Sequence, residues 1–366
     1  MIQYEYQVRF NTPAFLGNAE QVGQWRTPPF KALLRQWWRV AFAAGRHASV
    51  DVDDMRLQEG MLFGVATDGR DGSRKSRIRI RLDRWDVGAE KKAGWGRQEL
   101  SPGTKVNHPE VKQPIGALLY LGFGPLEVSK VAPPGKPPGF ATTLKKNAAI
   151  QMGEKATLSL AFPENNQQAI ETALRLIHHF GTIGGRSRNG WGSFDLIPAN
   201  DAAPNLDGEL DPAASRNWHD ALAMDWPHAI GRDERGLLIW RTPVSGDWKT
   251  LMRELAEIKI GLRTQFKFTT GRNATTPEPR HWLSYPVTNH NVQRWRERGR
   301  GDLRLPNSLR FKVRQDAAGK LFGAIFHVPC SPPTAFSPDR QAIEDVWSTV
   351  HHFLDNSNQI LTRIPA

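Results

Sequence analysis

The chain has 366 residues, 39% of them hydrophobic and 9% aromatic, which is enough for about two domains with cores and excludes disorder throughout. Lys and Arg number 49 against 37 Asp and Glu, and the formal net charge of +12 favours a polyanionic partner, nucleic acid first. The single cysteine, Cys330, excludes an intramolecular disulfide and a thiolate metal cluster, and suits a cytoplasmic protein.

The first half of the chain alternates strand and helix patterns. Residues 2–10 alternate apolar and polar side chains, which predicts a half-buried strand of an antiparallel or mixed sheet. Pro28-Pro29 opens a helix that Thr27 can cap, and the start of the chain carries no signal-peptide pattern. The other expected elements are the end of that helix near 44, an arginine-faced strand at 76–82, a proline- and glycine-rich surface loop at 131–139, a helix at about 167–180 and a strand at 193–197.

The second half repeats this order after a polar linker at 199–215. Its expected elements are a strand at 237–243, a helix at about 247–262, a hairpin of strands at 309–314 and 321–328, and a helix at about 338–355. No apolar stretch is long enough to span a membrane. We therefore expect an α+β protein of two tandem ferredoxin-like βαββαβ domains, at 1–198 and 216–366.

A loop at 181–192 interleaves glycine with basic residues between the helix and the strand that end the first half. A P-loop or dinucleotide fingerprint runs from strand into helix instead, so nucleotide hydrolysis is disfavoured. Gly181 stands where a left-handed C-cap residue belongs. Exposed N–H groups and the charges of Arg186 and Arg188 suit phosphate, which predicts RNA binding; a tight turn with two solvated arginines is the alternative.

The helix after Pro28-Pro29 carries Lys31, Arg35 and Arg39 at four-residue spacing, with no carboxylate on the same helix. Trp37 and Trp38 adjoin this stripe, and one indole is expected in the core while the other lies nearer the cations. Basic side chains beside aromatic rings suit single-stranded RNA, whereas solvated cations over two core tryptophans are the alternative.

Three further basic segments remain ambiguous between RNA, a neighbouring subunit and plain solvation. They are the loop 68–77, with Arg74, Lys75 and Arg77; the arginine-rich stretch 291–304 around Trp295; and the basic faces of strands 76–82 and 310–314, which either bind a polyanion or pair with carboxylates.

Several of these motifs together resemble the RAMP proteins of CRISPR systems, and among them the first RAMP subunit of type III-B (Cmr) effector complexes. The motifs are Thr12-Pro13-Ala14-Phe15-Leu16-Gly17, the tryptophan-rich segment 25–39, Leu62-Phe63-Gly64 followed by 76–80, the loop 181–192, and the segment 307–313.

The resemblance implies a RAMP fold and a non-catalytic RNA-binding subunit of an antiviral CRISPR ribonucleoprotein, near the crRNA 3′ end. It implies single-stranded RNA, crRNA or target, and other RAMP subunits as partners. The residues expected at RNA are Lys31, Arg35, Trp38, Arg39, Arg74, Lys75, Arg77, Gly184, Gly185, Arg186, Ser187, Arg188, Asn189 and Gly190.

Catalytic signals are weak. His219-Asp220 lacks further ligands at metal-site spacing, and no Gly-Gly-Asp-Asp stretch supports polymerase chemistry. Some RAMP relatives cut RNA, and the acidic cluster of Asp51, Asp53 and Asp54 keeps a RAMP endoribonuclease as the alternative function. No cofactor and no metal are expected.

Overall fold

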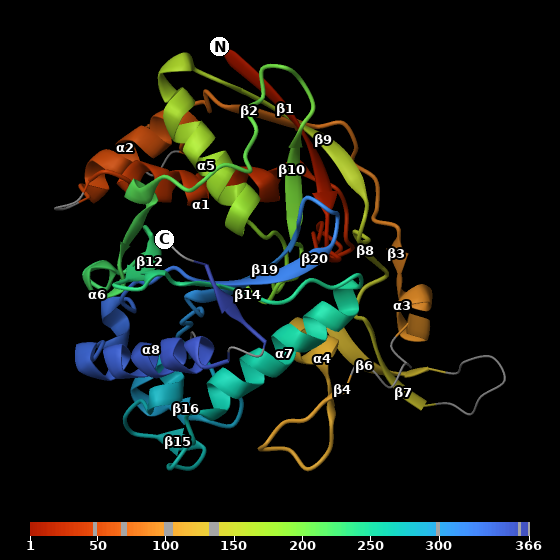
Figure 1. Cartoon of the computed structure of the whole chain (residues 1–366), viewed down its shortest axis with the longest axis vertical. Coiled ribbons are helices and arrows are strands. Elements are labelled where there is room, and N and C mark those ends of the chain that lie inside the picture. The colour runs from red at the N-terminus through yellow and green to blue at the C-terminus, as the bar shows by residue number, and fades with distance from the viewer. Residues whose placement is uncertain are drawn as a thin grey trace.

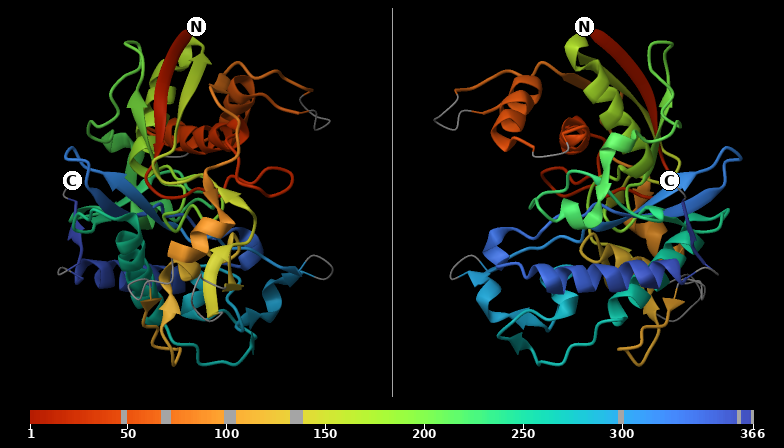
Figure 2. Two further views of the ribbon diagram at one scale, coloured as in Figure 1. Left: turned by 90° about the vertical axis from the view of Figure 1, so that its right-hand side faces the viewer. Right: turned by 60° about the vertical axis from the view of Figure 1, so that its left-hand side comes forward.

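The structure is a computed structural model that describes residues 1–46, 50–66, 72–98, 105–131, 139–297, 301–357 and 360–364. Two four-stranded antiparallel sheets, each with its own helices, form an upper and a lower half (Figures 1 and 2). The protein is therefore α+β, as its sequence predicts.

The first sheet has the strand order β10-β1-β9-β2. Its strands are β1 (Ile2–Phe10), β2 (Arg79–Leu82), β9 (Lys155–Phe162) and β10 (Phe194–Pro198). Buried and partly exposed residues alternate along β1 and β9, which confirms the half-buried strand predicted at 2–10.

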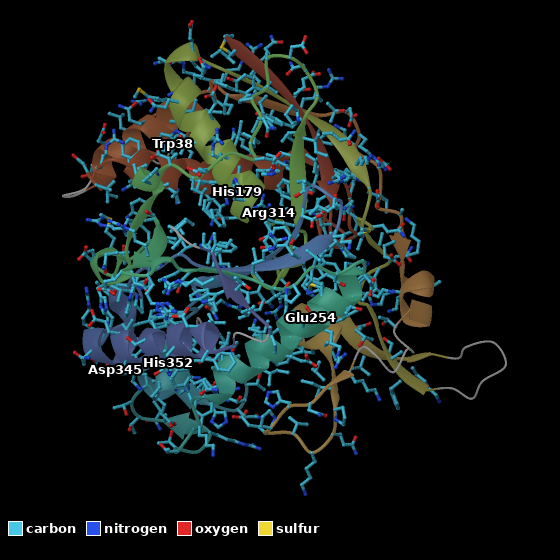
Figure 3. The ribbon with its side chains drawn as sticks, viewed as in Figure 1. Trp38, His179, Glu254, Arg314, Asp345 and His352 are labelled. Atoms are coloured by element: carbon cyan, nitrogen blue, oxygen red, sulfur yellow. The ribbon has the colours of Figure 1, made fainter. Side chains whose placement is uncertain are left out.

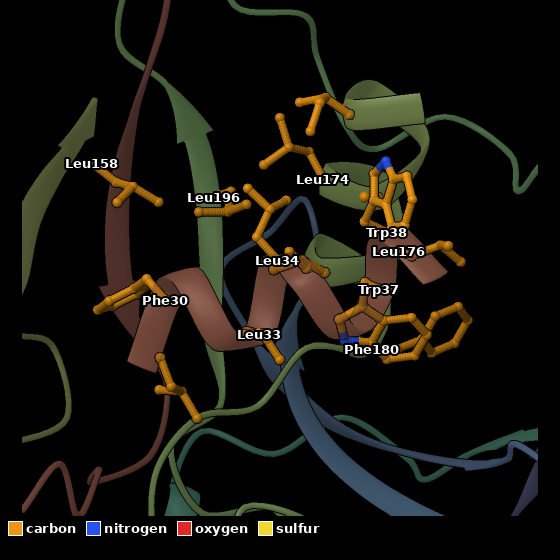
Figure 4. Close-up of a cluster of buried hydrophobic side chains, with 14 of the residues drawn as sticks. Phe30, Leu33, Leu34, Trp37, Trp38, Leu158, Leu174, Leu176, Phe180 and Leu196 are labelled. Carbon is orange, nitrogen blue, oxygen red and sulfur yellow. The ribbon is translucent and has the colours of Figure 1, made fainter. Parts of the chain in front are cut away.

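Helices α1 (Thr27–Ala43) and α5 (Gln167–Phe180) cover the buried face of this sheet, and α2 (Val52–Phe63) packs beside α1. Pro28 and Pro29 fill the first turn of α1, and Arg26 rather than Thr27 is its N-cap residue. Figure 4 shows apolar side chains of α1 and α5 meeting Leu158 and Leu196 of the sheet. These residues join one large core.

The second sheet has the order β19-β20-β14-β21. Its elements are β14 (Ile239–Arg241), α7 (Trp248–Thr264), β19 (Leu309–Gln315), β20 (Leu321–His327), α8 (Arg340–Asp355) and β21 (Thr362–Arg363). In both sheets the strands follow the chain as strand-helix-strand-strand-helix-strand, with the fourth strand beside the first and the third between the first and the second. We call these elements the first and the second unit.

The second sheet is buried on both faces, because α7 and α8 cover one side and α5 of the first unit meets the other (Figure 1). Lys312 of β19 is fully buried, and its Nζ donates to the carbonyl oxygens of Ile177 and His178 at 2.9 and 2.6 Å. The expectation that this basic strand face binds a polyanion or pairs with carboxylates is wrong for Lys312. It satisfies carbonyls at the C-terminal end of α5 instead.

A long insertion separates β2 from β9. Its elements are β3 (Glu90–Lys91), α3 (Lys92–Gln98), β4 (Lys105–Val106), β5 (Ile115–Gly116), α4 (Ala117–Gly122), β6 (Leu126–Val131), β7 (Gly139–Leu144) and β8 (Ala148–Ala149). Most of the surface loop expected at 131–139 lies outside the described residues, which omit 132–138. The insertion brings α4 against α7, so it becomes part of the boundary between the two units.

The chain between the units packs against the first unit before it enters the second. Leu206 is buried, and the Nε2 atom of His179 lies 3.1 Å from its carbonyl oxygen. The smaller elements that follow are β11 (Ser215–Asn217), α6 (Trp218–Ala221), β12 (Ile230–Asp233), β13 (Gly236–Leu237), β15 (Asn273–Ala274), β16 (Asn291–Val292), β17 (Arg296–Glu297) and β18 (Gly301–Asp302). None of the helices in the described ranges has the length and apolar character needed to cross a membrane.

Candidate nucleic-acid interface

The glycine-rich loop joins α5 to β10, as its sequence predicts, and its main chain is tightly packed. Gly181 is extended, with φ −70°, so the predicted left-handed C-cap is wrong; glycine fits because a Cβ there would lie 2.6 Å from the carbonyl oxygen of Ile177. Gly184 has φ +91°, and a Cβ there would meet the carbonyl oxygen of Phe15 at 2.8 Å.

Both units hold this loop in place. The Oγ atoms of Thr12 and Ser193 donate to the carbonyl oxygen of Gly190 at 2.7 and 2.8 Å. From the second unit, the backbone N–H of Phe311 donates to the carbonyl oxygen of Arg188 at 3.0 Å. A second hydrophobic core joins the second unit to the insertion, and Trp191 of the loop is fully buried in it. The loop is therefore held between the two units, with the side chains of Arg186 and Arg188 exposed.

A cleft of about 1890 Å³ opens beside the loop, and we call it the basic cleft. Its walls come from the loop, one side of α1, the insertion around α4, the C-terminal half of α7, and the segments 280–290 and 304–310. Its lining holds eight cationic side chains: Arg186, Arg188, Lys259, Arg263, Lys267, Arg280, Arg304 and Arg310. Among the lining residues in the described ranges, Glu110 is the single carboxylate, and it is already paired with Arg280 at 2.6 Å.

Several of these cations have lost hydration without gaining a counter-ion. Burial, with the nearby charge of Arg188, lowers the pKa of Arg310 to about 9, and its buried Nε atom has no hydrogen-bond partner in the described structure. Burial and the charges of Arg263 and Arg186 lower the pKa of Lys259 to about 7. Like charges held together at low hydration create a positive potential that an anion would relieve.

Aromatic side chains accompany these charges. Phe123 is 65% exposed. The Nε–H of Arg186 donates to the backbone carbonyl oxygen of Phe123 at 2.5 Å, so the exposed ring lies next to a guanidinium that is held in place. Phe268 and His290 stack with their ring centroids 3.8 Å apart at another wall. In such an arrangement the exposed ring can stack on an unpaired base, and the positive charge beside it can bind the phosphate backbone.

The structure does not bring the α1 stripe to the loop. Arg35 and Arg39 both pair with Glu59 of α2, a buried carboxylate whose pKa these arginines lower. The face of α1 that lines the cleft carries Leu33, Gln36 and Trp37 instead. Lys31, Arg35 and Arg39 sit on another face of the helix and do not line the cleft, and Glu59 of α2 is the carboxylate beside the two arginines.

Trp38 packs against Phe42 and Phe63, with 2% of its surface exposed, and belongs to the buried cluster of Figure 4, so it is not free to stack on a base in this structure. Trp37 is also buried, but one side of it lines the cleft and lies 5.8 Å from the guanidinium carbon of Arg310. We expected one indole in the core and the other near the cations, with Trp38 as the RNA contact. In the structure Trp38 is the core residue, and Trp37, although buried, is the one that reaches the cleft.

Arg74, Lys75 and Arg77 are exposed beside β2 and do not line the cleft. Asp68, Arg70 and Asp71 of the same loop lie outside the described residues, as do Arg298 and Arg300 of the arginine-rich stretch. Of that stretch, Arg304 reaches the cleft and Trp295 is buried in the second core. Arg74, Lys75 and Arg77 thus form a second exposed basic patch, which we call the β2 patch.

Sequence reasoning missed most of the cations of the second unit. Lys259, Arg263 and Lys267 follow one another at the four-residue spacing of the α1 stripe, and this signal was available in the sequence. Arg35 and Arg39 of the α1 stripe share a buried carboxylate on another helix, whereas Lys259 and Arg263 of α7, and Lys267 just beyond its end, line the cleft.

The acidic cluster at 51–54 serves α2. The side chain of Asp51 accepts hydrogen bonds from the backbone N–H groups of Asp53 and Asp54, at 2.9 and 3.1 Å, as an N-cap. His219 contacts Glu344 at 3.4 Å rather than a second histidine. In the part of the chain that the structure describes, no three His, Cys, Asp or Glu side chains are grouped as metal ligands.

Comparison with known proteins gives one match to a family model and several to solved structures. The fold is similar to apo Cmr1 from Pyrococcus furiosus, at 15% identity and a TM-score of 0.48 over 99% of this chain and 98% of that chain. It is also similar to a chain of a type III-B Cmr-beta complex bound to cognate target RNA, at 10% identity and a TM-score of 0.43 over 95% of this chain and 99% of that chain. A third similar structure is a chain of a type IV-B CRISPR complex, at 12% identity and a TM-score of 0.32 over 57% of this chain and 94% of that chain.

No curated protein matches the chain. The sequence model of the RAMP superfamily matches residues 8–195, which is just over half of the chain and spans the first unit from β1 to the loop and β10. The chain belongs to the RAMP superfamily.

Proposed function

We propose that this protein is a non-catalytic RNA-binding subunit of a CRISPR type III-B ribonucleoprotein effector complex in the cytoplasm. The observation that carries the proposal is the basic cleft, where the described residues place eight cationic side chains around a single carboxylate that is already paired. Family membership and the motifs of the first RAMP subunit supply the CRISPR context. Its partners are single-stranded RNA, crRNA near its 3′ end or target, and other RAMP subunits.

The two units are two ferredoxin-like RAMP domains in this proposal, at 1–198 and 216–366, joined through 199–215. RNA lies along the cleft between them, with Arg186, Ser187, Arg188 and Asn189 of the loop as one wall. Gly184, Gly185 and Gly190, which the sequence also placed at RNA, are not among the lining residues and shape the backbone of the loop. Charge on both walls follows the phosphates, and the ring of Phe123 stacks on a base. The β2 patch is a weaker, outer contact, since it has exposed charge and no enclosing wall.

The test measures binding of a fluorescein-labelled single-stranded oligoribonucleotide by anisotropy, from about 50 to about 200 mM KCl. We expect affinity to fall steeply with salt, because each neutralised phosphate releases counterions. The double variant Arg186→Ala/Arg188→Ala should lower affinity at least about tenfold and reduce the logarithmic salt slope by about 1.4.

The matched control is Arg74→Ala/Lys75→Ala, which removes the same charge from the β2 patch. It should weaken binding only about twofold to threefold, since these exposed side chains lie outside the cleft. If the control loses more affinity than the loop variant, RNA follows the β2 patch and the cleft assignment fails. Wild-type affinity that is insensitive to salt would remove the proposal altogether.

The non-catalytic role has its own test. End-labelled RNA incubated with the purified protein, with and without Mg²⁺, should remain intact over hours. Cleavage that co-purifies with the protein and disappears in the Asp53→Ala or Asp54→Ala variant would establish the endoribonuclease alternative instead.

A further inference from the structure

Lys259 lies at the floor of the basic cleft, on α7 and under the glycine-rich loop. Its Nζ donates to the side-chain oxygen of Asn189. The Nδ2 atom of Asn189 donates in turn to the carbonyl oxygen of Leu121 at 2.7 Å, which holds the amide oxygen toward Lys259. The amine is therefore fixed by one neutral acceptor, and no other residue in the described ranges accepts from it, which leaves its remaining N–H bonds for a ligand in the cleft.

The charged groups around this amine come from every element that packs against it. Arg263 lies one turn along α7, Arg186 comes from the loop, and Arg304 adds its charge next to Arg186. Tyr120 of α4 lies near Arg263, and Glu110 is taken by Arg280 at 2.6 Å. Within the described residues no carboxylate pairs with Lys259, so the positive charge here is uncompensated on all sides.

We propose that Lys259, Arg263 and Arg186 form a phosphate subsite at the floor of the cleft, and that Lys259 takes up a proton when an RNA phosphodiester enters it. The subsite deepens the proposed function, since it rests on RNA lying in the cleft. It adds a linkage between RNA binding and pH that the exposed arginines of the cleft cannot supply, because guanidinium stays charged throughout the accessible range.

The direction of the linkage follows from the environment of the amine. Burial and two neighbouring arginines lower the pKa of Lys259 to about 7 in the free protein. A phosphate in contact raises that pKa toward its ordinary value of about 10.4. Between these two values the complex holds more protons than the free protein, so affinity decreases as pH rises, by up to about tenfold per pH unit.

The useful window runs from about pH 7.5 to about pH 8.5, because Arg310, whose pKa burial lowers to about 9, titrates just above it. Ordinary histidines are already neutral there, and burial lowers the pKa of His108 further. Burial raises the pKa of Tyr120 above its usual value, and it raises that of Cys330, which interacts with Arg310 but does not line the cleft, to about 11. A proton whose uptake disappears in the Lys259→Arg variant is therefore assigned to Lys259 rather than to Arg310.

The experiment measures affinity for the same oligoribonucleotide across this window at constant ionic strength. Wild type should bind roughly tenfold more weakly at the upper end, and calorimetry in two buffers of different ionisation enthalpy should report uptake of about one proton at pH about 8. Lys259→Arg, which stays charged, should bind RNA with a flat pH profile, and Lys259→Gln should be flat and weaker at the lower end.

The matched control is Lys267→Gln, which removes an exposed lysine from the same cleft and should keep the wild-type pH slope. Wild-type protein that binds RNA with a flat profile and no proton uptake overturns the subsite while the proposed function stands. A slope that survives in Lys259→Arg, or disappears in Lys267→Gln, also overturns it. Wild-type protein that binds no RNA at any pH refutes the proposed function itself.

Discussion

Strands β2 and β19 are equivalent in position and similar in sequence, but the structure uses them in opposite ways. Each is the second strand of its unit and an edge strand of its sheet, and each alternates apolar with basic side chains. In β2 the side chains of Arg79 and Arg81 are exposed. In β19 Arg310 and Lys312 are buried at the boundary between the units.

The difference lies in what covers the strand. The glycine-rich loop lies along β19, where the Oγ atom of Ser193 accepts from the backbone N–H of Val313 at 2.8 Å. Arg314 lies near His179 at the end of α5 (Figure 3), and burial and this charge lower the pKa of His179 to about 3. A basic strand face therefore predicts a ligand only when no neighbouring helix end or loop supplies its partners.

The largest expected effect is on stability in β19. Lys312→Ala should lower the free energy of unfolding by about 3 kcal/mol, because it leaves a cavity and two carbonyl oxygens of α5 without a donor. Urea denaturation measures the change. Lys312→Met keeps most of the volume and should lose about 1–2 kcal/mol; a Met variant more stable than wild type would mean that the cost of burying the amine exceeds the value of its hydrogen bonds.

The pH dependence of stability is the next effect, at the same boundary. Burial, followed by the charge of Lys312, lowers the pKa of His178 to about 3. Its Nδ1 accepts from the backbone N–H of Leu196 at 3.3 Å, so protonation of that nitrogen would break the bond. Below about pH 6.5 this histidine binds a proton in the unfolded chain, but in the folded protein it stays neutral down to about pH 3. The free energy of unfolding therefore decreases as pH falls from about 6.5 toward about 3.

His178→Gln should remove that contribution. Between pH about 6.5 and about 5, the variant should lose about 2 kcal/mol less stability than wild type, as measured by urea unfolding at each pH. The buried pair of His327 and His351 remains and preserves part of the slope, because burial lowers their pKa values as well. An unchanged slope would mean that His178 is protonated in the folded protein.

The smallest expected effect is in β2. Arg79→Ala and Arg81→Ala should each change the free energy of unfolding by no more than about 0.5 kcal/mol, since both side chains are exposed. Thermal unfolding measures this beside the Lys312 variants. A loss above about 2 kcal/mol would show that the β2 face is covered in the folded protein, and the contrast between the two strands would disappear.

Much of the fold was predictable from local patterns. Helical spacing and alternation gave α1, α5, α7, α8 and the long strands to within a few residues, because these periods directly reflect which face is buried. The repeat of strand and helix order also suggested two α+β halves. The short elements of the insertion between β2 and β9 carry no such period, and they went unassigned.

The candidate site was predictable only in part. The excess of positive charge and the loop around Arg186 and Arg188 were evident in the sequence, and the loop does line the cleft. Lys259, Arg263 and Arg310 were not recognised as site residues, because their importance depends on being buried together without carboxylates. Spacing along the chain carries no information about that.

The sequence by itself therefore determined the elements, the basic character and the family motifs, which follow from local periodicity and composition. Only the tertiary structure decided which basic side chains remain free. Glu59, on another helix, pairs with both Arg35 and Arg39. Carbonyl oxygens at the end of α5, more than 130 residues away in the chain, accept the hydrogen bonds of Lys312. A charge is available to a ligand when folding leaves it without a partner, and such partners come from distant segments that no local pattern specifies.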